Sequence, residues 1–138
     1  MQPAIDGIIE SALYVEDLDE SVKFYETILG FRRMFCNERM CSMSVSEKHV
    51  FLLFKKGAST RSLDTPSGLV PGHDGSGELH VAFAISSESV DDWHHWLGEK
   101  NVEIESTVRW ERGGTSLYFR DPDDHCVELV TPGTWEIY

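Results

Sequence analysis

Short runs of alternating apolar and polar residues occur twice along this chain, each followed by a helical pattern. The first run, ESALYV, covers Glu10–Val15, and the second, HVAFAI, covers residues 80–85. Alternation at every second position is typical of a half-buried strand. Apolar residues then recur at helical spacing over 19–29, with Gly30 as the stop, and over 87–98. The pattern therefore predicts two strand–helix units.

Three more strand-like runs follow each helical pattern. They cover 33–37, 41–45 and 49–54 after the first helix, and 102–110, 115–120 and 125–130 after the second. HVFLLF at 49–54 aligns with HCVELV at 125–130, so Leu52 takes the position of Glu128. The chain thus predicts a single α+β domain made of two βαβββ modules, whose strands form a curved mixed sheet around a cavity. The modules span 7–56 and 77–134, and a connection rich in Gly, Ser and Pro spans 57–76.

Strand alternation assigns a bulky apolar face and a small or polar face to each predicted sheet. Leu13, Phe83 and Leu129 belong to the apolar face, which suits packing against the helices. We expect the opposite face to form the wall of a cavity. On it we place Glu10, Ala12 and Tyr14, then His80, Ala82 and Ala84, then Ser116, Tyr118 and Arg120, and finally Cys126, Glu128 and Val130.

Glu128 stands inside an apolar strand, where an unpaired ionised carboxylate would cost several kcal/mol. It therefore needs a cation, a metal or water. If the modules are related by a pseudo-twofold axis, Glu10, Leu52, His80 and Glu128 meet at one place. Carboxylate and imidazole ligands would bind Zn, Ni, Mn or Fe(II), and Leu52 would leave the site open. Three plainer interpretations stay open: a core role for His80, a buried salt bridge from Arg120 to Glu128, and a solvated Glu10.

Composition narrows the possible partners. The 138 residues carry a formal net charge of -12, which argues against a nucleic-acid or anionic-membrane surface and favours a small-molecule substrate. No segment is long and apolar enough to span a bilayer, and no targeting segment is evident. Three cysteines without C-x-x-C spacing argue against a disulfide framework. We expect reduced thiols in a cytoplasmic protein.

The stretches LYVEDLDESVKFYETILGF, LHVAFAI and SLYFRDPDDHCVELVTP resemble the first strand and helix, the fifth strand and the final hairpin of the vicinal oxygen chelate superfamily. This superfamily includes glyoxalase I, bleomycin-binding proteins, extradiol dioxygenases and the fosfomycin resistance enzymes. The hairpin is most similar to the fosfomycin resistance branch.

The resemblance implies a metal-centred cavity with His80 and Glu128 at positions that match ligands. Glu10 departs from the pattern, since most metal-binding relatives have histidine there, and Leu52 replaces the fourth ligand of glyoxalase I. The resemblance also implies that Ser116 and Tyr118 face the substrate. A homodimer is expected from the resemblance alone.

These observations predict a divalent-metal-dependent lyase, isomerase or transferase that binds a small oxygenated substrate through its oxygens. Tyr118 and Arg120 would orient the substrate, and Glu10 is the candidate base if it is not a ligand. Two alternatives remain: a metal-free binding protein for a drug or metabolite, and an iron-dependent dioxygenase. The expected substrate-binding wall consists of Tyr14, Leu52, Phe54, Trp110, Ser116, Tyr118 and Arg120.

Overall fold

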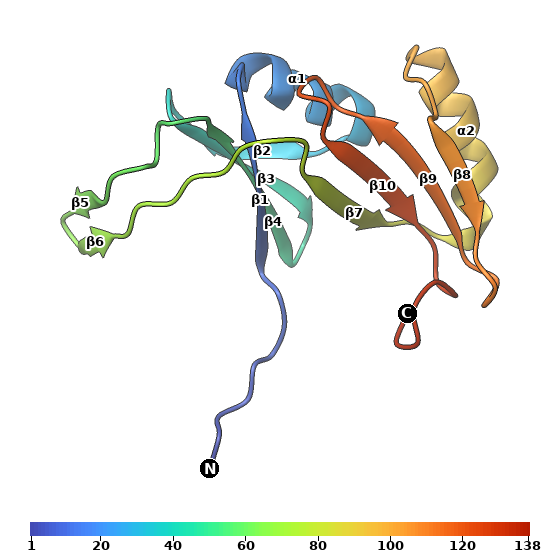
Figure 1. The fold of residues 1–138 in the computed structure, drawn as a ribbon, viewed down its shortest axis with the longest axis horizontal. Helices are drawn as coiled ribbons and strands as arrows, with labels where there is room; N and C mark the ends of the chain where they lie inside the picture. Colours follow the sequence, from blue (N-terminus) through green and yellow to red (C-terminus); the bar gives the residue numbers. More distant parts are fainter. The chain divides into compact units, whose positions relative to one another are not determined.

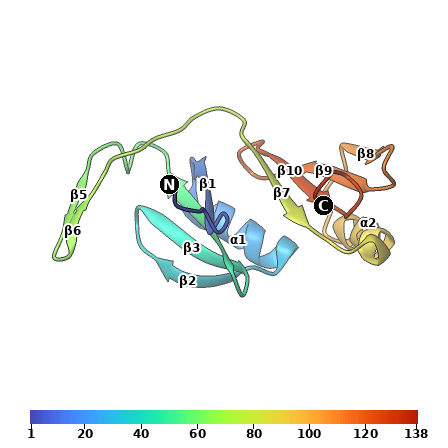
Figure 2. The same cartoon turned by 90° about the horizontal axis from the view of Figure 1, so that it is seen from below.

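The computed structural model describes the whole chain, Met1–Tyr138, as two compact units. The first unit is Met1–Ser76 and the second is Gly77–Tyr138. Each unit contains one four-stranded sheet and one α-helix (Figures 1 and 2). Neither helix is long and apolar enough to cross a membrane.

The first unit is built on a mixed sheet with strand order β1-β4-β3-β2. Its outer strand β1 runs parallel to β4, while the other neighbours are antiparallel. A separate hairpin, β5–β6, projects away from this sheet (Figure 2). The elements are β1 (Glu10–Val15), α1 (Leu18–Leu29), β2 (Arg32–Cys36), β3 (Met40–Ser46), β4 (His49–Lys55), β5 (Leu63–Thr65) and β6 (Gly68–Val70).

The second unit repeats this topology in the strand order β7-β10-β9-β8. Strand β7 runs parallel to β10, and the remaining pairs are antiparallel. Figure 1 shows α2 alongside this sheet. The elements are β7 (His80–Ala84), a 3₁₀ turn (Ser87–Ser89), α2 (Val90–Glu99), β8 (Ser106–Arg109), β9 (Thr115–Arg120) and β10 (Cys126–Val130).

Strand register confirms the internal repeat residue by residue. Ala12 pairs with Leu52 in the first sheet, and Ala82 pairs with Glu128 in the second. Leu52 and Glu128 are therefore equivalent positions in two copies of one backbone arrangement. The predicted α+β class and the two βαβββ modules are confirmed, and each module forms a hydrogen-bonded sheet of its own.

The two faces of each sheet differ as the alternation predicts. In the first unit, Leu13, Phe51 and Leu53 are at most 2% exposed, and the Phe51 ring lies 4.7 Å from the Tyr25 ring of α1, centroid to centroid. In the second unit, Leu117, Phe119, Val127 and Leu129 are equally buried. Burying these side chains supplies the main favourable free energy of folding in each unit.

Both ends of α1 follow from its sequence. The Asp17 side chain accepts a hydrogen bond from the backbone N–H of Glu20, which caps the first turn. Gly30 adopts a left-handed conformation with φ 73° at the other end, as its position after the helical pattern predicts. A residue with a Cβ would be strained there.

Three expectations differ from the structure. Residues 102–105 are not in a strand, because the chain is still leaving α2 and the Val102 N–H bonds to the Leu97 carbonyl. The connection 57–76 contains the β5–β6 hairpin. The expectation that all thiols are reduced is wrong for Cys36 and Cys41, which form a disulfide because the β2–β3 register sets them directly opposite.

Replacing Leu53 by Ala should lower the free energy of unfolding by about 2–5 kcal/mol, since Leu53 is 0% exposed and its loss leaves a cavity. Leu52→Ala is the matched control, because this neighbouring leucine lies half-buried on the opposite face. It should cost about 1 kcal/mol or less. Urea unfolding followed by circular dichroism measures both, and equal losses would contradict the assignment of faces.

Candidate functional site

The candidate site lies on the open face of the second sheet, around the central strand β10. Glu128 stands between Ala82 of β7 and Tyr118 of β9 in the strand register. The small Ala82 side chain leaves room beside the carboxylate. His80 is placed at the start of β7, opposite Cys126. The structure therefore brings together two of the three expected ligands.

A hydrogen bond to the backbone of the neighbouring strand orients the His80 ring. Its Nδ1 atom lies 2.9 Å from the carbonyl oxygen of Cys126. A carbonyl can only accept, so Nδ1 carries a hydrogen, and Nε2 presents a lone pair when the ring is neutral. Nε2 lies 3.4 Å from Oε1 of Glu128, which is also an acceptor when ionised. Two acceptors that face each other in this way call for a proton or a metal cation between them.

The donor pair fits a divalent metal. Two ligand atoms that are each about 2.1 Å from a tetrahedral metal lie about 3.4 Å apart, which matches the Nε2–Oε1 separation. Metal-binding histidines also commonly donate their second ring N–H to a backbone carbonyl, as His80 does. No three histidine, cysteine, aspartate or glutamate side chains are grouped to hold a metal ion. The second unit thus supplies two ligand atoms.

Glu128 is 7% exposed and is held by hydroxyl donors. Its Oε2 atom accepts a hydrogen bond of 3.0 Å from Ser116 Oγ, which in turn accepts one of 2.8 Å from Trp110 Nε1. The sequence predicted Ser116 and Trp110 as substrate-binding residues. The structure shows that their polar atoms are already bonded within the protein.

Tyr118 adds a further hydrogen-bond donor at the carboxylate. Burial raises the pKa of its phenol above the ordinary value, and hydrogen bonding and charge repulsion from Glu128 raise this pKa further. A hydrogen bond with Ser116 acts in the opposite direction. Because the net shift is upward, the phenol stays protonated at neutral pH and can donate.

Arg120 bonds to groups other than Glu128. Its Nε donates to Oε2 of Glu105 at 2.9 Å, and one terminal nitrogen donates to the Asp124 carbonyl at 3.0 Å. The salt bridge from Arg120 to Glu128, considered from the sequence, is therefore replaced by one to Glu105. Its role toward a substrate stays a prediction.

Cys126 shares this strand and is the free cysteine of the chain. Burial raises the pKa of its thiol, an effect that Arg120 partly opposes. A protonated thiol is a weak nucleophile, so this environment does not activate Cys126.

The remaining expected residues lie on the open face of the first unit. Glu10 and Tyr14 occupy β1, and Leu52 and Phe54 occupy β4, the strand that runs parallel to β1 and pairs with it. Glu10 is exposed and Phe54 is buried. A ligand role for Glu10 stays a prediction from the sequence, as does substrate contact by Tyr14, Leu52 and Phe54.

His73 is a residue of this first-unit face that the sequence did not single out. Its Nδ1 lies 2.7 Å from the Tyr14 hydroxyl, and its ring packs edge-on against Phe54 with centroids 4.5 Å apart. Gly75 crosses the Tyr14 ring so closely that a Cβ there would come within 2.4 Å. His73 belongs to the connecting segment, where no periodic pattern indicates which strand the chain contacts.

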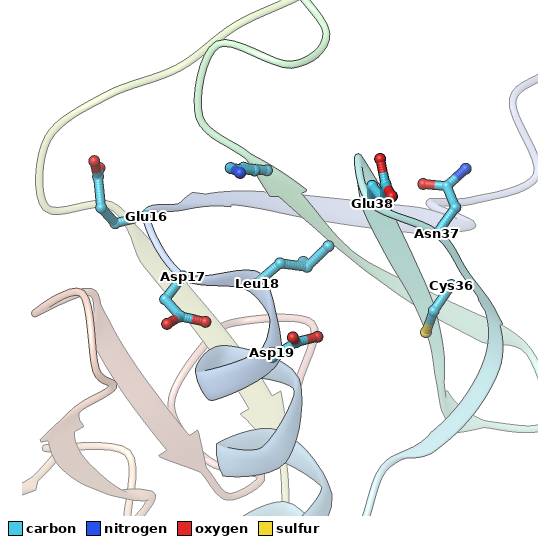
Figure 3. Close-up of a pocket in the computed structure, with 8 residues that line it drawn as sticks. Glu16, Asp17, Leu18, Asp19, Cys36, Asn37 and Glu38 are labelled. Atoms are coloured by element: carbon cyan, nitrogen blue, oxygen red, sulfur yellow. The ribbon is translucent and has the colours of Figure 1, made fainter.

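An acidic hollow of about 690 Å³ also lies in the first unit (Figure 3). Glu16, Asp17 and Asp19 come from the entry to α1, and Glu38 comes from the β2–β3 turn. None of the expected site residues lines this hollow. Asp17 is already used as the helix cap, so we place the candidate site at Glu128 instead.

Comparisons with known proteins agree with this fold and hairpin. The family model described as Glyoxalase/Bleomycin resistance protein/Dioxygenase superfamily matches residues 7–129. The metallothiol transferase FosB of Staphylococcus haemolyticus (strain JCSC1435) is 30% identical over 128 residues, which cover 92% of this chain and 84% of the relative.

Two solved structures have the same fold. Lactoylglutathione lyase from Agrobacterium tumefaciens has a TM-score of 0.87 at 27% identity, covering 97% of this chain and 99% of that one. The fosfomycin resistance protein FosX from Listeria monocytogenes has a TM-score of 0.67 at 22% identity, covering 93% and 94%. The FosB match supports the fosfomycin resistance branch to which the last hairpin is similar. The chain belongs to the Glyoxalase/Bleomycin resistance protein/Dioxygenase superfamily.

Proposed function

We propose that this protein is a divalent-metal-dependent transferase that joins a thiol to a small oxygenated electrophile. The observation that carries the proposal is the pair of acceptor atoms, His80 Nε2 and Glu128 Oε1, facing each other at 3.4 Å. The reaction class follows the FosB relative, whose name describes a metallothiol transferase. Fosfomycin is the first electrophile to test, because the chain is similar to that branch.

In this proposal His80 and Glu128 hold the metal. A bound divalent metal supplies a Lewis acid that polarises a substrate oxygen. In this proposal Tyr118 redirects its single phenol hydrogen from Glu128 to that oxygen, and its raised pKa keeps the phenol protonated. Arg120 offers an anionic substrate group the part of its guanidinium that is not bonded to Glu105 or to the Asp124 carbonyl. In this step the co-substrate thiol would lose its proton, its sulfur would form a C–S bond as a C–O bond of the electrophile breaks, and the released oxygen would take up one proton in place of the one that the thiol lost.

Metal content tests the centre directly. The full chain, purified without chelator or affinity nickel and incubated with Mn, Fe(II), Ni or Zn, should retain close to one metal per chain by inductively coupled plasma mass spectrometry. His80→Ala and Glu128→Gln should each lose it, because each removes one of the two facing donor atoms. His95→Ala is the control, since this exposed imidazole pairs with Glu99 on α2.

A metal-free wild-type chain after all four incubations would contradict the proposal and favour a binding protein for a drug or metabolite. Oxygen consumption by the Fe(II)-loaded chain would favour a dioxygenase instead. The same preparations therefore separate the three functions considered from the sequence.

Tyr118→Phe should lower the rate of thiol transfer by about a hundredfold while leaving metal content unchanged, because it removes one hydroxyl donor to the reacting oxygen. The assay incubates the metal-loaded chain with fosfomycin and either cysteine or glutathione, and measures the S–C adduct by mass spectrometry. Tyr138→Phe removes a hydroxyl outside the site and should keep the wild-type rate. Equal rates in the Tyr118→Phe and Tyr138→Phe variants would show that the Tyr118 hydroxyl takes no part in the reaction.

A further inference from the structure

We propose that Trp110 and Ser116 are positioning residues that orient Glu128 toward the metal, instead of contacting the substrate. This inference rests on the proposed metal-dependent function. It assigns both residues a role that differs from the one expected from the sequence. Trp110 directly follows β8, Ser116 lies in β9 and Glu128 lies in β10, and all three belong to the second unit.

The direction of the hydrogen bonds follows from the chemistry of each group. An indole N–H only donates, so the Ser116 oxygen is the acceptor of the 2.8 Å contact with Trp110. The single hydroxyl hydrogen of Ser116 is then directed to Glu128 Oε2 at 3.0 Å. Each group therefore donates toward Oε2 of the Glu128 carboxylate.

The backbone around Trp110 keeps the indole in place. The Trp110 N–H bonds to the Gly114 carbonyl, and the Gly113 N–H bonds back to the Trp110 carbonyl, which closes a tight turn. Gly113 has φ +97°, and a Cβ on Gly114 would lie 2.6 Å from the Gly133 carbonyl carbon. The turn thus favours glycine at both positions and fixes the backbone from which the Trp110 side chain extends.

Burial leaves Ser116 little freedom for a second role. It is 0% exposed, and its oxygen and its hydrogen each have a partner inside the protein. Trp110 is 39% exposed, so one part of its ring meets solvent while the N–H is engaged inside. Substrate contact by Ser116 would require breaking this series of bonds.

The two oxygens of the Glu128 carboxylate therefore have different partners. Oε2 is held by Ser116, which directs Oε1 toward His80 Nε2. His80 is oriented in the same manner by the Cys126 carbonyl. Partners of this kind typically change metal affinity by about 10- to 100-fold when they are removed.

The test measures Mn(II) affinity of the full chain by isothermal titration with manganese chloride. Ser116→Ala should weaken binding by about 10- to 100-fold, and Trp110→Phe by up to about tenfold, because the serine keeps its bond to Glu128 in the second variant. The double variant should bind as weakly as Ser116→Ala alone, since Trp110 acts through Ser116. Trp96→Phe is the matched control, because Trp96 is 37% exposed and lies on α2.

Two further readouts separate positioning from general stability. The visible absorption of the Co(II)-loaded chain reports ligand geometry and should change in Trp110→Phe while the thermal unfolding midpoint of the metal-free chain stays close to wild type. Ser116→Thr keeps the hydroxyl and should restore most of the Mn(II) affinity lost in Ser116→Ala. If Ser116→Ala does not fold, the results with Trp110→Phe alone test the positioning role.

Wild-type Mn(II) affinity and an unchanged Co(II) spectrum in Trp110→Phe and Ser116→Ala would overturn the positioning role while leaving the metal centre intact. Additive losses in the double variant would also overturn it. A wild-type chain that binds neither Mn(II) nor Co(II) would overturn the proposed function itself. The two failures are therefore distinguishable in one set of titrations.

Discussion

Glu128 is a carboxylate on a central strand of a packed sheet, and the second unit is organised around the need to satisfy it. With 7% exposure it has little access to water, so its charge requires donors from the protein or a cation. Ser116 and Tyr118 on the neighbouring strand donate to the carboxylate, and His80 on the other side presents a ring nitrogen that can share a proton or a metal cation with it. An apolar residue at the same position, as Leu52 shows in the first unit, needs none of them.

The faces of the sheets and the pairing of equivalent residues could be predicted from the sequence. Alternation in HCVELV separates Glu128 from the buried Val127 and Leu129, and a sheet with one buried face has only one register that preserves this separation. The same reasoning places His80 beside β10 once the repeat is recognised. Local sequence patterns were sufficient to predict these faces, because successive side chains of a strand point to opposite faces of the sheet.

Contacts made by turns and connections could not be predicted in this way. Trp110 reaches Ser116 because a turn containing Gly113 and Gly114 directs it there, and no periodicity encodes such a turn. His73 meets Tyr14 across 59 positions of sequence. The Cys36–Cys41 disulfide depends on the register of two adjacent strands, which cysteine spacing alone does not reveal.

The equivalence of Leu52 and Glu128 has a consequence for how such a chain evolves. Two identical subunits must accept every mutation in both copies, whereas two modules in one polypeptide diverge separately. Here the shared backbone register survives in both halves, while one half carries an aliphatic side chain where the other carries a carboxylate. Covalent fusion thus permits the two halves to carry chemically different side chains at equivalent positions of one backbone arrangement.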